Sequence, residues 1–195
     1  MPQPLGSFRN LLRRFRRDRR GVTAVEFALV APVFFALLFA IIETALIFFA
    51  GQVLETITQD TARMVLTGQA QNSSLSQAQF KDLVCGHKLS FMFDCKNGIY
   101  VDVRSYPQAT VVKIPNQIDA GSGFVNDMKY CPGQDGNIVV VRLFYQWPVL
   151  IIKMLKLGGY DLQYDLSNLN GSKRLLSATA VFKNEPFPVG GMTCS

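Results

Sequence analysis

The apolar residues of this chain are concentrated in one long stretch near its N-terminus. From Phe27 to Ile42 no residue carries a charge, and after Glu43 the apolar character continues to Ala50. A helix that crosses a bilayer needs about 20 mostly apolar residues. The pattern therefore predicts a transmembrane helix over residues 22–50, even though two glutamates lie within it.

Beyond this stretch the pattern becomes periodic. Apolar side chains recur three and four residues apart, while charged and amide side chains lie between them. This spacing is typical of an amphipathic helix, and Gly68 is a suitable residue to end it. We predict one continuous helix from about Thr23 to Leu66, roughly 65 Å long, with residues 51–67 outside the membrane. The predicted apolar face consists of Val53, Leu54, Ile57, Thr61, Ala62, Val65 and Leu66.

The rest of the chain, residues 68–195, has the pattern of a small globular domain. Ser74 and Gln77 have the spacing of a capping box, which predicts a short helix to about Val84. The side chains expected to face inward from this helix are those of Phe80, Leu83 and Val84.

Three later segments have the pattern of β-strands. Residues 99–106 alternate, with Ile99 on one side and Asp102 on the other. Residues 137–147 form an almost continuous apolar run that favours a central strand, and residues 175–182 form a third candidate. Residues 107–137 are rich in Pro, Gly, Asn and Asp, which indicates a long surface loop. We expect an α+β domain with a small antiparallel sheet of three or four strands packed on the amphipathic helix.

The charge of the chain supports a membrane anchor. The net charge is +6, and residues 1–21 account for all of it with seven arginines and one aspartate. A basic segment beside a membrane span holds that end of the chain in the cytoplasm. The part after Ala50 is then expected on the other side, which is the periplasm if the cell has two membranes. A nucleic-acid partner is not needed to explain the arginines, although such a binder would lose affinity as salt rises.

The four cysteines all lie in the part expected outside the cytoplasm, where disulfides form and persist. Four cysteines allow three pairings. We favour Cys85–Cys95, which closes a short loop, and this choice leaves Cys131 with Cys194. The alternative is a metal site built from Cys85, His87 and Cys95, but three ligands without a paired CxxC motif make a weak zinc site.

Signals of catalysis and of cofactor binding are absent from the sequence. His87 is the single histidine, so every histidine-dependent nucleophile would depend on it. There is no phosphate-binding glycine motif and no cluster of carboxylates at a useful spacing. We expect a protein that is not an enzyme and that carries no cofactor and no metal.

Two acidic residues and one proline inside the apolar stretch need separate explanations. Pro32 tends to kink a helix, although membrane helices tolerate proline. Glu43 fits either the outer membrane surface or a pairing role against a partner helix. Glu26 is costly at the start of a membrane helix, so either it lies among the headgroups or the chain is cleaved shortly before it.

The residues around Glu26 resemble a known family. A basic leader that ends in Gly21, followed by an apolar helix with Glu26 at mature position five and Phe27 at position six, resembles the class III signal of type IV pilin-like proteins. The run G-V-T-A-V-E-F-A-L-V-A-P, residues 21–32, is similar to TadE-like pseudopilins of tight-adherence (Flp/Tad) pilus systems. The motifs Y-Q-W-P, residues 145–148, and F-K-N-E-P-F, residues 182–187, carry the same resemblance. TadG-like relatives are usually larger, which favours the TadE or TadF type.

The resemblance implies a pilin-like fold and a mode of assembly. A prepilin peptidase would remove the leader 1–21 by cutting between Gly21 and Val22, and Glu26 would act in subunit assembly. The expected partners are other pilin and pseudopilin subunits, the inner-membrane assembly platform and lipid. The mature protein would serve pilus biogenesis, adhesion or secretion from the cytoplasmic membrane or from within the filament. The alternative is an uncleaved single-pass envelope protein whose periplasmic domain binds a ligand or another protein.

Overall fold

The computed structural model describes residues 21–150 and 166–187. The chain divides into two compact units, Met1–Ile42 and Glu43–Ser195. We call residues 22–42 the anchor segment and Glu43–Ser195 the C-terminal unit. Helix α2 (Val22–Leu66) contributes to both, and its bounds confirm the single helix predicted from the sequence.

In the anchor segment, α2 exposes apolar side chains on all sides. The helix passes through Pro32 without ending there. Because proline lacks an N–H group, the carbonyl four residues earlier, that of Ala28, loses its usual helical donor. A helix that is apolar all round is suited to lipid or to a large protein core.

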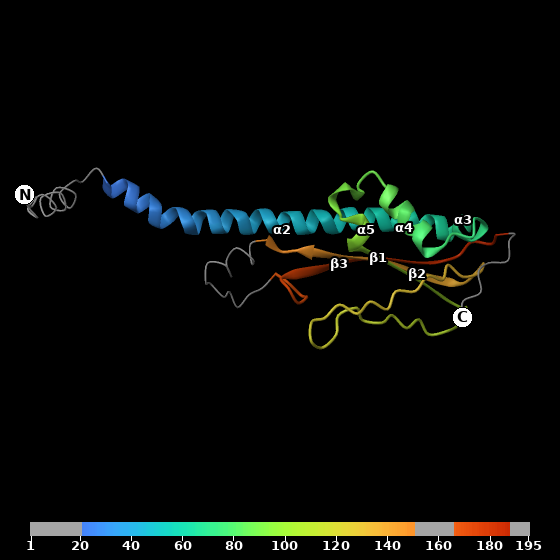
Figure 1. The fold of residues 1–195 in the computed structure, drawn as a ribbon. Helices are drawn as coiled ribbons and strands as arrows, with labels where there is room; N and C mark the ends of the chain where they lie inside the picture. The colour runs from blue at the N-terminus through green and yellow to red at the C-terminus, as the bar shows by residue number, and fades with distance from the viewer. Residues whose placement is uncertain (1–20, 151–165, 188–195) are drawn as a thin grey trace, which may run out of the picture. The chain divides into compact units, whose positions relative to one another are not determined.

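The C-terminal unit places the rest of α2 on a three-stranded sheet (Figure 1). The strands are β1 (Ile99–Tyr106), β2 (Ile138–Pro148) and β3 (Lys173–Lys183), and they are antiparallel in the order β1-β2-β3. The α+β prediction is therefore confirmed. Each observed strand agrees with its predicted segment to within two residues at either end.

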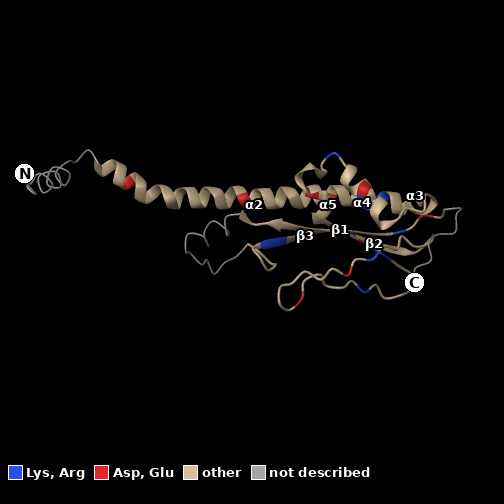
Figure 2. Ribbon diagram, in the orientation of Figure 1, with Lys and Arg blue, Asp and Glu red and all other residues tan. Residues whose placement is uncertain are grey.

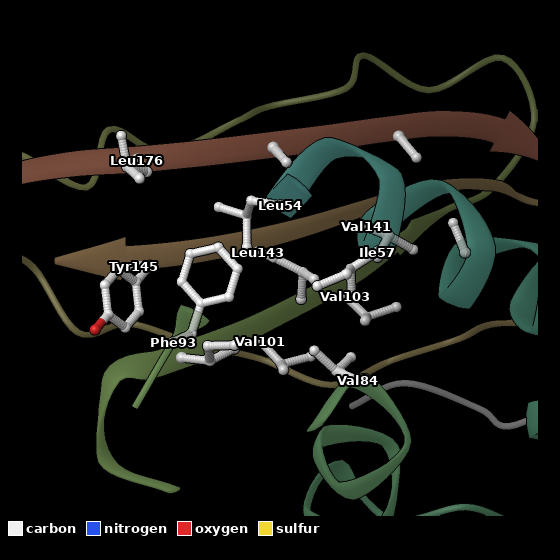
Figure 3. Packing of buried hydrophobic residues seen from close by; sticks show 14 of the residues in the cluster. Leu54, Ile57, Val84, Phe93, Val101, Val103, Val141, Leu143, Tyr145 and Leu176 are labelled. Atoms are coloured by element: carbon white, nitrogen blue, oxygen red, sulfur yellow. The ribbon is translucent and has the colours of Figure 1, made fainter. Parts of the chain in front are cut away.

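The core lies between α2 and the inner face of the sheet (Figure 3). The predicted helical face is buried from Val53 to Val65, with Leu54, Ile57 and Val65 fully buried, whereas Leu66 is only half-buried. Branched residues of the strands complete the layer, because alternate side chains of a strand point to the same face. These strand residues include Val101, Val103, Val141, Leu143, Leu176 and Ala178.

Two contacts fix the direction of α2 along the sheet. The backbone N–H of Leu150, which follows β2, donates to the carboxylate of Glu43. The backbone N–H of Glu185, which follows β3, donates to the carbonyl of Leu66 at 3.0 Å. Strand β3 therefore runs in the same direction as this part of α2, and β2 runs in the opposite direction.

The end of α2 needs a glycine for two reasons. Gly68 has φ of +74°, a conformation that costs an L-residue with a side chain about 1 kcal/mol or more. In addition, a Cβ atom at this position would lie 2.6 Å from the ring of Phe187. The predicted end of the helix at Gly68 is thus confirmed.

Short helices follow α2 and cover one side of the core. They are α3 (Gln69–Asn72), α4 (Gln77–Gly86), the 3-10 helix η2 (Ser90–Met92) and α5 (Cys95–Gly98). The capping box of α4 is formed by Ser76 and Gln79, so the predicted pair of Ser74 and Gln77 is wrong by two residues. Phe80 and Val84 are buried as expected, whereas Leu83 is exposed, because α4 covers the sheet with a narrow stripe.

The outer face of the sheet carries a buried ion cluster that the sequence did not predict. Asp102 was expected on a polar side, but its side chain is fully buried. It pairs with its cross-strand neighbour Arg142, whose Nη2 lies 2.6 Å from Oδ2, and with Arg104, whose Nε lies 3.0 Å from Oδ1. Its Oδ1 also accepts the backbone N–H of Lys129 at 2.9 Å.

This cluster holds the long loop on the sheet. Arg142 donates from Nη1 to the carbonyl of Pro115 at 2.9 Å and to Oε1 of Gln117 at 2.7 Å. Arg104 reaches Asp127 in the same loop. Burial acts to lower the pKa of the Arg104 guanidinium, but its hydrogen bonds and charge interactions with Asp127 and Asp102 leave that pKa raised. The ion pairs therefore explain why a loop rich in Pro and Gly is ordered on this face.

Removing one partner of the buried ion pair should lower the free energy of unfolding more than replacing both partners with apolar residues. Arg142→Met leaves the Asp102 carboxylate buried with fewer partners, and we expect a loss of about 3–5 kcal/mol in the free energy of unfolding. In the double variant Asp102→Leu/Arg142→Met, Arg104 keeps Asp127 as its partner. This variant should recover most of the loss in denaturant titrations of the full chain in detergent. A double variant less stable than Arg142→Met would contradict this account.

Candidate functional site

The candidate site is the start of α2, where the sequence predicts processing and assembly. Val22 is the first residue of the helix, and Gly21 immediately precedes it. Gly21 is exposed, and a Cβ atom added to it would find no other atom within 4 Å. Gly21 is therefore accessible to another protein, and no contact with the described residues demands glycine there.

Glu26 and Phe27 lie in the first two turns of the helix and are both exposed. Within the described residues, the Glu26 carboxylate has no hydrogen bond and no ion pair. Glu26 follows Val22 by four residues, which places both on the same helical face about one turn apart. A carboxylate at this position could meet a cation at the helix start, either in its own chain or in another.

The surface around this carboxylate is apolar. Figure 2 shows that the first part of α2 carries few charged positions. The helix is long and apolar enough to cross a membrane by length and composition, and the most apolar window has no buried residues. The exposed large side chains in it include Phe27, Leu29, Val30, Val33, Phe34, Leu37, Phe39 and Ile41.

Glu43 has different surroundings, because it belongs to the C-terminal unit. Its residue is only 6% exposed, and its carboxylate accepts the backbone N–H of Leu150. Burial of an acid is costly without a hydrogen-bond donor, and this amide supplies one. In this structure Glu43 therefore joins α2 to the end of β2 within a single chain.

The cysteines agree with the predicted disulfide framework as far as the structure describes them. Cys85 and Cys95 form a disulfide with 5.6 Å between their Cα atoms, which confirms the favoured pairing and links α4 to α5. Cys131 is also disulfide-bonded. Cys194 lies outside the described residues, so its pairing with Cys131 stays a prediction.

The alternative metal site is excluded by these bonds. Two of its three ligands, Cys85 and Cys95, are consumed by the disulfide. The third, His87, pairs through Nε2 with Oδ2 of Asp60 at 2.9 Å and so links the end of α4 to α2. Among the described residues no group of three or more potential ligands could hold a metal ion.

The buried ion cluster is the feature that sequence reasoning missed. One signal was available, because Arg142 interrupts an otherwise apolar strand. A charge in the middle of a buried strand requires an opposite charge nearby, and Asp102 was a candidate. The register that makes them neighbours could not be read from the sequence.

Comparison with known proteins identifies the same region. The family of TadE-like proteins matches residues 21–63, which begin at Gly21 and cover α2 almost to its end. No curated protein and no solved structure matches the chain significantly. The resemblance to TadE-like proteins is thus confirmed over the helix. The motifs at residues 145–148 and 182–187 lie outside the matched residues.

The match and the helix together support two coarse statements about this protein. TadE-like proteins are components of tight-adherence pilus systems rather than a family of enzymes, so the match associates this chain with such a system. Among the described residues, one helix near the N-terminus is long and apolar enough to cross a membrane, which indicates a membrane-anchored protein. Association with other pilus components follows from the same match.

Proposed function

We propose that this protein is a minor pseudopilin of a tight-adherence pilus machine, and that a prepilin peptidase processes it. One observation carries the proposal: an exposed Gly21 directly precedes an apolar helix with Glu26 as its fifth residue, where the TadE-like match begins. The chemistry of the segment favours a protein that is inserted in the membrane first and assembled later.

The leader determines the first stage. Its arginines hold the N-terminus in the cytoplasm, so the C-terminal unit lies in the periplasm. Seven arginines beside the span oppose any movement of the helix out of the bilayer. Cleavage between Gly21 and Val22 removes them and leaves a helix with an uncharged surface around Glu26.

Glu26 determines the second stage. Cleavage creates a positive amine on Val22, one helical turn from the carboxylate. Either charge alone is expensive in an apolar setting, whereas a pair with good geometry offsets much of that cost. Glu26 can pair with the Val22 amine of the same subunit or of a neighbouring one. A pair between subunits favours a bundle in which the helices are aligned at their N-terminal ends. Phe27 adds apolar contact beside this pair.

The remaining parts have supporting roles. Pro32 gives the anchor segment a carbonyl without its usual donor, where a bend costs less. The C-terminal unit, with its disulfides, presents the surfaces that choose neighbouring pilin subunits or the assembly platform. No step of this mechanism requires a cofactor, a metal or nucleic acid.

The cleavage step is tested by enlarging Gly21. An added Cβ at Gly21 has no atom within 4 Å in the described part of the chain, so we expect Gly21→Leu to fold and enter the membrane normally but to keep its leader. Gly51→Leu, within α2, is the control, because an added Cβ at Gly51 also has no atom within 4 Å. Intact mass of the protein from membranes distinguishes the forms. If Gly21→Leu is processed normally, the cleavage signal does not depend on Gly21. If the wild-type protein itself keeps its leader, an uncleaved single-pass envelope protein is favoured.

The assembly step is tested at Glu26. Glu26→Gln keeps the size of the side chain but removes its charge, so we expect normal cleavage and a loss of most filament formation or partner recovery. Glu55→Gln is the control, since Glu55 is an exposed acid in the extramembrane part of α2. Pilus yield and co-purified subunits are the measurements. Unchanged assembly of Glu26→Gln would remove the proposed role of the carboxylate.

A further inference from the structure

The feature that suggests a further role is the free edge of β3. Strand order places β1 and β3 at the two edges of the sheet. At β1 the edge is partly covered, because Val103 bonds to Lys129 and Cys131 through its backbone and the side chain of Gln77 donates to the carbonyl of Val101. At β3 the described residues provide a comparable cover only near the start of the strand.

The direction of the β3 backbone groups follows from its contacts. Residues 168 and 169 donate to the carbonyl of Lys173, and the N–H of Leu175 donates to Oδ1 of Asn168. In an antiparallel ladder the N–H and C=O of alternate residues point to the same side. Ser177, Thr179 and Val181 must therefore point their backbone groups away from β2.

These groups have no partner in the described part of the chain. Within residues 21–150 and 166–187, no backbone or side-chain hydrogen bond involves the outward N–H or C=O groups of Ser177, Thr179 or Val181. The segment between Arg174 and Lys183 contains no charge and no proline. Proteins commonly protect a long edge strand with charged residues or proline, because an unprotected edge pairs readily with another strand.

A cleft beside this edge offers a second contact. It measures about 260 Å³ and lies on the outer face, between the loop and β3. Ser177, Thr179 and Gln117 contribute to its lining. Gln117 is 3% exposed, and its Nε2 has no hydrogen-bond acceptor in the described residues. A strand added to β3 could place an acceptor side chain in this cleft.

We propose that the free edge of β3 binds an extended strand of a different pilus subunit, as a fourth strand of the sheet. The charges favour a strand with an uncharged middle and acidic flanks, since Lys173 and Arg174 lie at one end of the edge and Lys183 at the other (Figure 2). Main-chain hydrogen bonds supply the affinity in such strand addition, and side chains supply the specificity. The inference rests on the proposed function, because it names a partner in the same machine.

A second copy of this chain fits the edge poorly in either direction. An antiparallel pair of β3 strands would reverse one α2 relative to the other, because α2 and β3 run in the same direction. The two Glu43 residues, each directly after its anchor segment, would then lie at opposite ends of the pair, which two chains in one membrane cannot satisfy. A parallel pair would bring Lys173 and Arg174 of both copies together, and like charges across strands are destabilising.

Amide hydrogen exchange tests the edge within a single strand. In the purified full chain in nanodiscs, the amides of Ser177, Thr179 and Val181 should exchange fast, while those of Ala178 and Ala180, which face β2, should be protected. In the protein isolated with its assembled machine, the first three should slow by on the order of 100-fold, as expected for hydrogen-bonded amides. Exchange at these three positions that is unchanged by assembly would overturn the proposal.

Photo-crosslinking identifies the partner. A benzophenone amino acid at Val181, which is 58% exposed, should link to one extended segment of another subunit, mapped by mass spectrometry. The control position is Phe91, which is 79% exposed but lies in η2, away from this edge. Links from Val181 to β3 of a second copy, or no link beyond the control, would contradict the assignment.

A proline variant connects the edge to assembly. Thr179→Pro removes an outward N–H without removing a bond to β2, and edge strands tolerate such a proline. We expect recovery of the partner to fall about tenfold, consistent with one or two lost hydrogen bonds. Thr179→Val, which keeps the backbone donor, should bind normally. Equal recovery with both variants would count against the edge. Each sample is also checked for an N-terminus at Val22, so that a failure of processing is distinguished from a failure of docking.

Discussion

The structure depends on a single constraint on helix α2, whose apolar surface must be kept from water along its whole length. In the anchor segment apolar side chains surround the helix, and only lipid or other apolar helices can cover all sides at once. From Glu43 onward the apolar residues form one stripe, and the sheet covers it. The same helix therefore requires lipid or other apolar helices around its start and its own β-sheet further along.

Two of three acids, Glu43 and Asp102, are buried beside hydrogen-bond donors or arginines, whereas the third, Glu26, is not. Glu43 is buried but accepts a backbone N–H, and Asp102 is buried but shares two arginines and a backbone amide. In contrast, Glu26 lies exposed on the apolar anchor segment and pairs with no described residue. An isolated carboxylate at that position is costly in a membrane, and it becomes favourable once a cation arrives. This difference between the three acids is the physical basis for assigning assembly to Glu26.

The sequence predicted the features that local patterns determine. The bounds of α2, the glycine at its end and the three strands follow from periodicity and composition, because each is decided within about ten residues. The disulfide between Cys85 and Cys95 followed from their short separation. The capping box was displaced by two residues because two serines, Ser74 and Ser76, compete near the start of α4, and only Ser76 stands immediately before the first helical residue.

Features that depend on register could not be predicted. Asp102 and Arg142 lie 40 residues apart in sequence and become neighbours only through the pairing of β1 with β2. The apolar run of residues 137–147 correctly favoured the central strand, but the local pattern could not show which edge of the sheet the loop at residues 107–137 would cover. For the candidate site the opposite holds: Gly21, Val22, Glu26 and Phe27 are adjacent in sequence, so the local motif was sufficient to find them.

The most direct test of the central claim is the intact mass and N-terminal sequence of the protein from its native membrane, with and without the prepilin peptidase. The account predicts a chain that begins at Val22 when the peptidase is present and at the original N-terminus when it is absent. A chain that keeps its arginine-rich leader in both backgrounds would contradict the account. The protein would then be an uncleaved membrane anchor for its periplasmic unit.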